Sequence, residues 1–372
     1  MNRTILLCAG GTGGHLFPAE ALAYALKDRG WSVHLATDHR AETYGQNFPA
    51  DETHIIRSAT PSVKSPKVLL AAAWSLWQGY RQSKAMLKRL RPAAVVGFGG
   101  YPTVPPLLAA VHLRIPSVAH DANAVLGRAN RLLASRVSAV ATSFPEVGHA
   151  DAASGKVVQT GNPVRQMVID ASKLPYPAQP EGGPLKLVVF GGSQGARFFS
   201  DLLPEALAKL DAASRARLSI VQQCRPEDMD RVRAAYDRLG VTAELASFFK
   251  DMPARIAASH LVVSRSGAST VCELAVIGRP AIMVPLPGAI DQDQSANALV
   301  LARAGGGWVV PQAELTADRL ARELTVFLAE PGRLAQAAAA ARSVGRPDAV
   351  ERLADLVERV AGGKRPDGST GV

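Results

Sequence analysis

The chain has 372 residues and a formal net charge of +10, and 47% of its residues are hydrophobic and 20% charged. This length is natural for two domains, and the composition is that of a soluble globular protein. Three scattered cysteines exclude a disulfide framework and fit a reducing cytoplasm, and no apolar run is long enough to span a bilayer. The positive charge favours an acidic partner, and by itself it does not distinguish nucleic acid, anionic lipid and phosphorylated metabolite.

The sequence begins with a strand, a glycine loop and a helix. Residues 4–9 (TILLCA) are expected to form a buried parallel strand, residues 10–15 the loop, and residues 18–26 an apolar helix. Such a loop lets backbone N–H groups approach an anion closely and places the anion at the positive end of the helix. The first apolar run is too short for a signal-peptide core, so we interpret it as the first strand of a domain.

Further short apolar runs alternate with helical segments, as an open parallel sheet requires. The predicted strands are residues 32–36, 54–57, 94–98, 117–120 and 139–142. We therefore expect the first half of the chain, residues 1–163, to be one doubly wound domain.

Residues 63–91 contain seven basic side chains and no acidic one. At about 100° per residue, a helix that starts at Pro66 has one apolar stripe that is expected to face the core. That stripe consists of Leu69, Ala73, Leu76, Tyr80, Leu87 and Leu90. A second stripe carries Trp74 and Trp77 beside Arg81 and Lys84, which is typical of a helix that lies on anionic headgroups. The alternative is that both indoles are packed inside and the basic residues are a solvated face; the lack of acids favours the membrane interpretation.

The same pattern begins again in the second half of the chain. Residues 161–163 and the Pro- and Gly-rich run 175–184 mark a break, and residues 185–190 predict a strand that leads into the glycine loop 191–196. Two such starts predict an α/β protein with two Rossmann-like domains facing a central cleft, the second over residues 164–342. Residues 343–361 are expected to be a helical segment that packs back on the N-terminal domain, and residues 362–372 a disordered tail.

The stretch from Ser264 to Asn297 is the most informative. It predicts a short buried strand over residues 261–264, a break at Gly267, and a helix that ends at Gly278. Glu273 lies one turn into this helix, where a carboxylate can accept hydrogen bonds from both hydroxyls of a ribose. Thr270 and Glu273 also fit a capping box, which needs no ligand, and the residues alone leave the two interpretations about even.

Five motifs together resemble the MurG family, N-acetylglucosaminyltransferases that convert lipid I to lipid II in peptidoglycan synthesis. The motifs are AGGTGGHLFPA from Ala9, GFGGYPT from Gly97, GNPVR from Gly161, GGSQGAR from Gly191 and SRSGASTVCELAVIGRPAIMVPLPGAIDQDQSANA from Ser264. They span nearly the whole chain in the family's order, which is far more specific than one glycine loop. The resemblance implies the GT-B glycosyltransferase fold, with the sugar donor held mainly by the C-terminal domain and the lipid acceptor met by the N-terminal one.

The resemblance also implies which residues contact the donor, UDP-N-acetylglucosamine. They are Thr12, Gly13, Gly14, Asn123, Arg165, Ser193, the segment Ala268, Ser269, Thr270, Val271, Cys272 and Glu273, and Gln294. It gives Glu273 the ribose hydroxyls and places Phe249 beside the uracil, while the amide of Gln294 suits sugar hydroxyls. No tightly bound cofactor and no metal are expected, because glycine loops at helix N-termini can hold the leaving diphosphate. We discount the Asp-x-Asp pattern at Asp291 for that reason.

His15, at the end of the first glycine loop, is the general base that the resemblance implies. The acceptor's C4 hydroxyl would attack the anomeric carbon opposite the UDP, with inversion from α to β. A hydroxyl is a poor nucleophile without a positioned base, and a neutral imidazole is well matched to that role. Without the resemblance, a lone histidine in a loop is more often structural.

The resemblance has one departure at its centre, and it leaves rival functions to consider. Where the family usually has His-Glu-Gln-Asn, this chain has His120-Asp121-Ala122-Asn123, which puts a role for a longer acid or an amide there in doubt. The implied location is peripheral, on the cytoplasmic face of the inner membrane. The implied partners are UDP-N-acetylglucosamine, undecaprenyl-linked lipid I and anionic lipids, with no nucleic acid. The rivals are a GT-B transferase for another lipid such as diacylglycerol, a UDP-sugar epimerase, and a basic nucleotide- or nucleic-acid-binding protein, for which no recognition motif is present.

Overall fold

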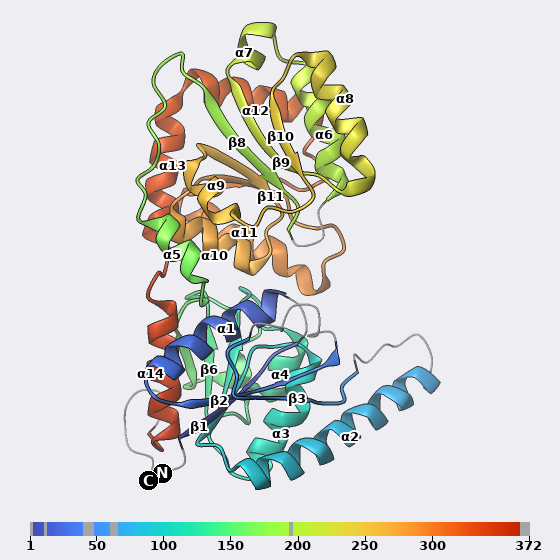
Figure 1. Ribbon diagram of the computed structural model, residues 1–372, viewed down its shortest axis with the longest axis vertical. Coiled ribbons are helices and arrows are strands. Elements are labelled where there is room, and N and C mark those ends of the chain that lie inside the picture. Colours follow the sequence, from blue (N-terminus) through green and yellow to red (C-terminus); the bar gives the residue numbers. More distant parts are fainter. Residues whose placement is uncertain (1–2, 11–12, 40–47, 60–65, 193–195, 365–372) are drawn as a thin grey trace. The chain divides into compact units, whose positions relative to one another are not determined.

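The protein, described by a computed structural model, forms two compact units (Figure 1). The structure describes residues 3–10, 13–39, 48–59, 66–192 and 196–364. Unit 1 consists of Met1–Arg165 together with Pro347–Val372, and unit 2 consists of Gln166–Arg346. The boundary follows Arg165, where the sequence analysis placed it after residue 163.

Unit 1 contains a seven-stranded parallel sheet in the order β3-β2-β1-β4-β5-β6-β7. Its strands are β1 (Thr4–Cys8), β2 (Ser32–Thr37), β3 (Glu52–Ile55), β4 (Ala94–Gly97), β5 (Ser117–Asp121), β6 (Ala139–Thr142) and β7 (Val157–Gln159). Its helices are α1 (Gly13–Asp28), α2 (Pro66–Leu90), α3 (Val104–His112), α4 (Arg128–Ala134) and α14 (Ala349–Ala361). Side chains of the central strands pack alternately on α1 and α14 and on α2, α3 and α4, so both faces of the sheet are covered.

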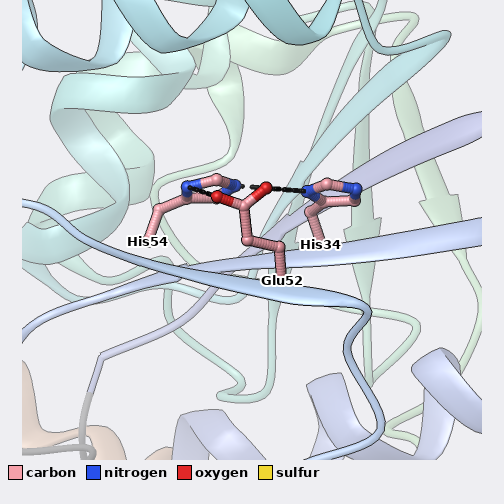
Figure 2. Close-up of side chains that lie close together, drawn as sticks. All are labelled: His34, Glu52 and His54. Carbon is pink, nitrogen blue, oxygen red and sulfur yellow. Dashed lines mark hydrogen bonds and ion pairs between the residues drawn. The ribbon is translucent and has the colours of Figure 1, made fainter.

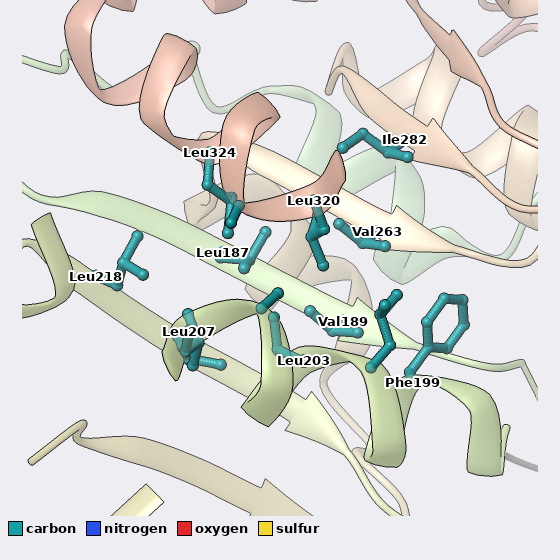
Figure 3. Close-up of a cluster of buried hydrophobic side chains, with 14 of the residues drawn as sticks. Leu187, Val189, Phe199, Leu203, Leu207, Leu218, Val263, Ile282, Leu320 and Leu324 are labelled. Carbon is teal, nitrogen blue, oxygen red and sulfur yellow. The ribbon is translucent and has the colours of Figure 1, made fainter. Parts of the chain in front are cut away.

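Unit 2 contains a six-stranded parallel sheet in the order β10-β9-β8-β11-β12-β13. Its strands are β8 (Leu185–Phe190), β9 (Leu218–Gln223), β10 (Ala243–Ala246), β11 (Leu261–Ser264), β12 (Ala281–Met283) and β13 (Gly307–Val309). Its helices are α5 (Gln166–Ser172), α6 (Arg197–Ala208), α7 (Ala212–Ala216), α8 (Met229–Leu239), α9 (Met252–Ala258), α10 (Ala268–Ile277), α11 (Asp293–Arg303), α12 (Ala317–Ala329) and α13 (Pro331–Ser343). Figure 3 shows the core in which Leu187 and Val189 of β8 pack against α6 and α12. Each unit is therefore an α/β layer structure of the predicted Rossmann-like class.

The prediction misplaced one strand of unit 1, missed another, and misplaced the start of one helix. β3 begins at Glu52, where residues 54–57 were predicted, and β7 was not predicted. Both are edge strands with polar or exposed residues, so they lack the continuous apolar run that marks a buried strand. α1 begins at Gly13 and contains Pro18, which the prediction had taken as its first residue.

The core-facing stripe predicted for α2 is wrong in its first half. Leu69 is 46% exposed, and the buried residues of the helix, among those whose burial is described, are Ala72, Gly79, Ser83, Met86 and Leu87. The helix crosses close to the chain at Gly79, where an added Cβ atom would lie 2.0 Å from the carbonyl oxygen of Arg57. From this crossing to its C-terminus α2 has three buried side chains, those of Ser83, Met86 and Leu87. Before the crossing only Ala72 is buried among the residues whose burial is described, and the large apolar residues near the N-terminus are exposed.

The last helix belongs to unit 1. Leu353, Leu356 and Val357 of α14 are buried in the same core as α1 and the first strands. The Arg29 guanidinium pairs with Glu351, Asp355 and Glu358 of α14, and the indole N–H of Trp31 donates to Glu358 at 2.7 Å. The return to unit 1 occurs at Pro347, whereas the sequence analysis placed it at residue 343. Most of the predicted tail, residues 365–372, lies outside the described residues.

Candidate functional site

The first glycine loop joins the end of β1 to the start of α1. Gly13 and Gly14 form the first turn of α1, where backbone N–H groups have no partner inside the helix. Gly14 is exposed, and an added Cβ atom there would contact nothing within 4 Å. Gly13 and Gly14 thus lie at the positive end of α1, and anion binding there stays a prediction. Thr12, also predicted for this site, lies outside the described residues.

His15 is held in a seat made by two glycines of the GFGGYPT motif. Gly99 and Gly100 have φ values of +84° and +75°, a region that side chains other than glycine rarely adopt. A Cβ atom on Gly99 would lie 3.3 Å from Cε1 of His15, and one on Gly100 would lie 3.5 Å from Nε2. The imidazole therefore contacts backbone that lacks Cβ atoms, and it is only half-buried. The ring is thus held, partly exposed, in the first turn of α1.

His120 lies behind this seat and is a neutral structural histidine. Burial lowers the pKa of its imidazole to about 4. Its Nε2 donates to the carbonyl oxygen of Gly161 at 3.2 Å, and its ring lies 5.3 Å from that of Phe98. His120 thereby ties the end of β5 to the GNPVR motif, which leads to Arg165.

Asp121 shapes the loop that carries Asn123. Its carboxylate accepts hydrogen bonds from the backbone N–H groups of Asn123 at 3.0 Å and Gly127 at 2.8 Å. It also accepts from Nδ2 of Asn130 at 2.9 Å, and the whole residue is buried. The acid at this departure from the family pattern is therefore used to fold the loop. Asn123 itself is half-buried, and the hydrogen bond from its backbone N–H to Asp121 holds its backbone in place.

Arg165 lies over the first turns of α1. Its guanidinium carbon is 4.7 Å from the centre of the Phe17 ring. Burial raises the pKa of the nearby Glu20 carboxyl, while the positive charge of Arg165 opposes that shift. Arg165 and His15 thus both lie at the N-terminal end of α1.

The second glycine loop follows β8 in unit 2. The N–H of Gly191 donates to the side-chain oxygen of Gln223 at 3.2 Å, and Gly192 has a φ of +85°. These contacts turn the chain sharply at the carboxyl end of the sheet, where ligands of this fold class bind. Ser193, predicted to contact the diphosphate, lies outside the described residues.

The start of α10 decides between the two interpretations of Glu273. The residue that caps α10 is Gly267, and no side chain makes a capping hydrogen bond to the helix there. Thr270 therefore lies inside the helix, and the capping-box interpretation of Thr270 and Glu273 is wrong. The side chains of Ser269, Thr270 and Glu273 are partly exposed, whereas Ala268, Val271 and Cys272 are buried. Only the first three can offer a side chain to a ligand, and the predicted contacts of the other three are limited to backbone atoms.

Gln294 is the second residue of α11 and lies at the same end of the unit 2 sheet. Its side-chain oxygen accepts from the N–H of Leu286 at 3.0 Å, and its carbonyl accepts from the hydroxyl of Ser266 at 2.8 Å. The preceding residues, Asp291 and Gln292, have φ values of +59° and +52°. Because an amide oxygen has two lone pairs, this hydrogen bond leaves Gln294 able both to donate to and to accept from a sugar hydroxyl.

The SFFKDM stretch has two adjacent aromatic residues, of which only one is exposed. Phe249 is buried, and the guanidinium carbon of Arg255 lies 4.3 Å from the centre of its ring. Phe248 is 64% exposed. Phe248 is therefore the exposed ring of the pair and Phe249 the buried one. The placement of Phe249 beside the uracil stays a prediction.

Sequence reasoning also missed Arg265, which lies between β11 and α10. The side chain is buried, and burial lowers the pKa of its guanidinium. It donates to the carbonyl oxygens of Val284 at 3.2 Å and Pro285 at 3.3 Å, and to the side-chain oxygen of Gln312 at 2.6 Å. Arg265 thus fixes the chain after β12, on the way to Gln294. The SRSG sequence was visible, but a buried arginine could not be distinguished from an exposed one.

The two tryptophans of α2 are on the surface of unit 1. Trp74 is 58% and Trp77 45% exposed, and their rings stack with centres 4.8 Å apart. The Arg81 guanidinium lies 5.0 Å from the Trp77 ring, and Lys84 Nζ lies 5.8 Å from the ring of Tyr80. Val68, Leu69 and Leu70 extend the exposed apolar surface to the N-terminal end of the helix. Within the described part of the chain, the two indoles are therefore not packed inside.

No helix in the described ranges is both long and apolar enough to cross a membrane.

Comparison with known proteins assigns both units to one family. Residues 5–142 match the glycosyltransferase family 28 N-terminal domain, and residues 186–353 match its C-terminal domain. A relative from Chelativorans sp. (strain BNC1) is 58% identical over 363 residues, which cover 98% of this chain and 96% of the relative. A relative from Sinorhizobium fredii is 57% identical over 359 residues, 96% of each chain. Both are named UDP-N-acetylglucosamine–N-acetylmuramyl-(pentapeptide) pyrophosphoryl-undecaprenol N-acetylglucosamine transferase.

Solved structures agree with this assignment. The crystal structure of Acinetobacter baumannii MurG matches with a TM-score of 0.78 at 30% identity, over 96% of this chain and 99% of that one. A UDP-GlcNAc 2-epimerase from Neisseria meningitidis matches with a TM-score of 0.64 at 15% identity, over 95% of this chain and 98% of that one. The second similarity reflects the shared fold alone. The chain therefore belongs to glycosyltransferase family 28 and, within it, to the MurG family.

Proposed function

We propose that this protein transfers N-acetylglucosamine from UDP-N-acetylglucosamine to the C4 hydroxyl of the N-acetylmuramyl unit of lipid I, which forms lipid II. The observation that carries the proposal is identity of 54–58% over nearly the whole chain with relatives that bear the name of this transferase. The two glycine loops, the seat of His15 and the exposed face of α10 supply the groups that such a reaction needs.

In the proposed reaction His15 is the general base. The C4 oxygen of the acceptor forms a bond to the anomeric carbon while its proton passes to the imidazole. The bond from that carbon to the diphosphate oxygen breaks, and UDP leaves with the electron pair, so the configuration inverts from α to β. The glycine seat supports this role because it fixes the ring while leaving it partly exposed.

The donor is assigned mainly to unit 2. Glu273 would accept hydrogen bonds from the ribose hydroxyls, Gln294 would donate to the sugar, and Phe248 or the backbone near Phe249 would border the uracil. The loop after β8 would bind the diphosphate, and the resemblance also assigns donor contacts to Gly13, Gly14, Asn123 and Arg165. The positive ends of helices supply the charge stabilisation, so we propose no tightly bound cofactor and no metal in this step.

We also propose that α2 docks the protein on anionic lipid at the cytoplasmic face of the inner membrane. The support is the exposed indole pair of Trp74 and Trp77 with Arg81 beside it, on a helix without acidic residues. Indoles favour the headgroup region, and each nearby basic residue adds attraction to an anionic surface. The net charge of +10 then has a lipid partner, with no role for nucleic acid.

Incubation with labelled UDP-N-acetylglucosamine tests the proposed function directly. With lipid I present, label should move to the lipid fraction as a disaccharide, and without acceptor the donor should remain intact. Label transferred to diacylglycerol in place of lipid I would contradict the acceptor assignment. Conversion of the donor to its epimer without any acceptor would contradict the reaction class.

A further inference from the structure

An unassigned cluster of metal-ligating side chains lies at the edge of the unit 1 sheet. His34 is on β2, and Glu52 and His54 are on the edge strand β3 (Figure 2). In the register of the two strands His34 pairs with Glu52, and Ala36 pairs with His54. Residues two apart on a strand point to the same face, so all three side chains lie on one face of the sheet.

The three side chains converge on one point. One nitrogen from each imidazole and one carboxylate oxygen all lie within 4.8 Å of one another. Nδ1 of His34 is 3.2 Å from Nε2 of His54 and 3.6 Å from Oε2 of Glu52. Four ligands at the usual Zn–N distance of about 2.0–2.1 Å stand roughly 3.3–3.4 Å apart in a tetrahedron. Both separations from Nδ1 of His34 are close to the edges of a zinc coordination sphere, whereas the contact of His54 with Glu52 is made by its other nitrogen, Nδ1, which lies 3.5 Å from Oε1. Because one atom from each side chain lies within 4.8 Å of the others, small side-chain shifts would complete the coordination sphere.

The burial of the cluster fits a site that an ion can enter. Both imidazoles are mostly buried and stack with ring centres 5.5 Å apart, which fixes their orientation. Glu52 is exposed, so the carboxylate side of the cluster is open to solvent. We propose that His34, Glu52 and His54 bind a divalent transition-metal ion of the Zn²⁺ type, with water in the fourth position. Two nitrogen ligands exclude Mg²⁺ and Ca²⁺, which require oxygen ligands.

The ion would cross-link the edge strand β3 to β2. Nη2 of Arg89, from the last turn of α2, lies 3.9 Å from Oε1 of Glu52. That distance is too long for a hydrogen bond, so the carboxylate remains able to bind a cation, although the positive guanidinium opposes one. Metal binding would therefore stabilise unit 1 at the strand next to α2, and it is a property separate from the proposed transferase reaction.

The test uses the full chain without an affinity tag, freed of metal by a chelator and titrated with Zn²⁺ by calorimetry. We expect one equivalent of Zn²⁺ to bind, and Co²⁺ to give the intense visible absorption of a four-coordinate ion. Replacing both imidazoles (His34→Gln with His54→Gln) should weaken binding by more than about tenfold, since even lost outer-shell partners cost about 10- to 100-fold. His149→Asn, at an exposed histidine outside the cluster, is the matched control and should bind as the parent does.

Two single variants keep the proposal testable if the double variant fails to fold. Glu52→Gln should weaken Zn²⁺ binding, and Arg89→Gln should strengthen it because the opposing charge is removed. Zn²⁺ should also raise the Tm of the parent by several degrees and leave that of Glu52→Gln nearly unchanged. Absence of saturable binding by the parent, or equal affinity in the parent and Glu52→Gln, would overturn the proposal.

Discussion

The two units use the same backbone device for different chemistry. In each, a glycine-containing turn at the end of a buried parallel strand leads into a helix: β1 into α1 in unit 1, and β11 into α10 in unit 2. The first turn of α1 carries His15, proposed as the proton acceptor, and the second turn of α10 carries Glu273, proposed as the hydrogen-bond acceptor for the ribose. The start of each helix supplies positive potential, so under this proposal the side chain beside it decides whether the turn serves catalysis or binding.

The largest effect should come from removing the proton acceptor of unit 1. His15→Ala should reduce kcat by about 100-fold or more, while donor affinity changes little, because the base acts on the acceptor's hydroxyl. Steady-state transfer at saturating lipid I, with UDP-N-acetylglucosamine affinity measured in parallel, separates the two quantities. Near-normal turnover would remove His15 from the mechanism and leave unit 1 without a catalytic side chain.

The corresponding change in unit 2 should affect binding. Glu273→Ala should weaken donor affinity by about 1.5–3 kcal/mol through lost charge-assisted hydrogen bonds to the ribose. Since Gly267 is the N-cap residue of α10 and Glu273 lies in its second turn, the fold should be intact, and an unchanged Tm would show it. Glu273→Gln is the matched control and should lose less. Unchanged affinity for UDP by calorimetry would contradict the ribose assignment.

A change on α2 tests whether membrane docking is confined to unit 1. A variant with Trp74→Ser, Trp77→Ser, Arg81→Glu and Lys84→Glu should lose sedimentation with anionic vesicles by more than about tenfold, since each basic residue contributes about 1 kcal/mol. Vesicle binding by the parent should fall as salt rises. The variant should still turn over a water-soluble short-chain acceptor. Equal vesicle binding by variant and parent would contradict the docking role.

The last prediction concerns His120, which lies behind the seat of His15. Because burial lowers the pKa of His120 from 6.5 to about 4, the unfolded chain takes up a proton there between these pH values and the folded one does not. Stability should therefore be full above pH 6.5 and fall as the pH drops towards 4, by at most about 1.4 kcal/mol per pH unit from this group. Urea unfolding of the parent and His120→Asn at pH 7.5 and 5 measures the difference. The same acid sensitivity in both proteins would show that other groups cause it.

The sequence predicted those parts of the fold that depend on local apolar runs. β6, β8 and β11 have the predicted bounds because each is a short, mainly apolar run; every residue of β6 and β11 is buried, and in β8 only Lys186 is exposed. β7 and the buried face of α2 depend on which neighbours are present, and no local pattern contains that information. The exposure of Leu69 is the clearest case, since this residue fits an apolar stripe yet is 46% exposed.

The candidate site was predictable to a similar extent. Motifs located His15, Glu273 and Gln294, but not what holds them. The seat of His15 depends on Gly99 and Gly100, which are far from it along the chain, and the choice between Phe248 and Phe249 depends on where Arg255 lies. The capping-box alternative for Glu273 could be excluded only once the first residue of α10 was known.

The division of labour between the two helix starts is tested most directly by single-turnover transfer at varied donor concentration, comparing His15→Ala with Glu273→Ala. We predict that His15→Ala lowers the maximal rate and leaves the half-saturating donor concentration unchanged. Glu273→Ala should raise the half-saturating concentration and retain most of the maximal rate. If both variants lose rate and affinity in parallel, the two turns are not separable into catalysis and binding, and the account given for unit 1 and unit 2 is wrong.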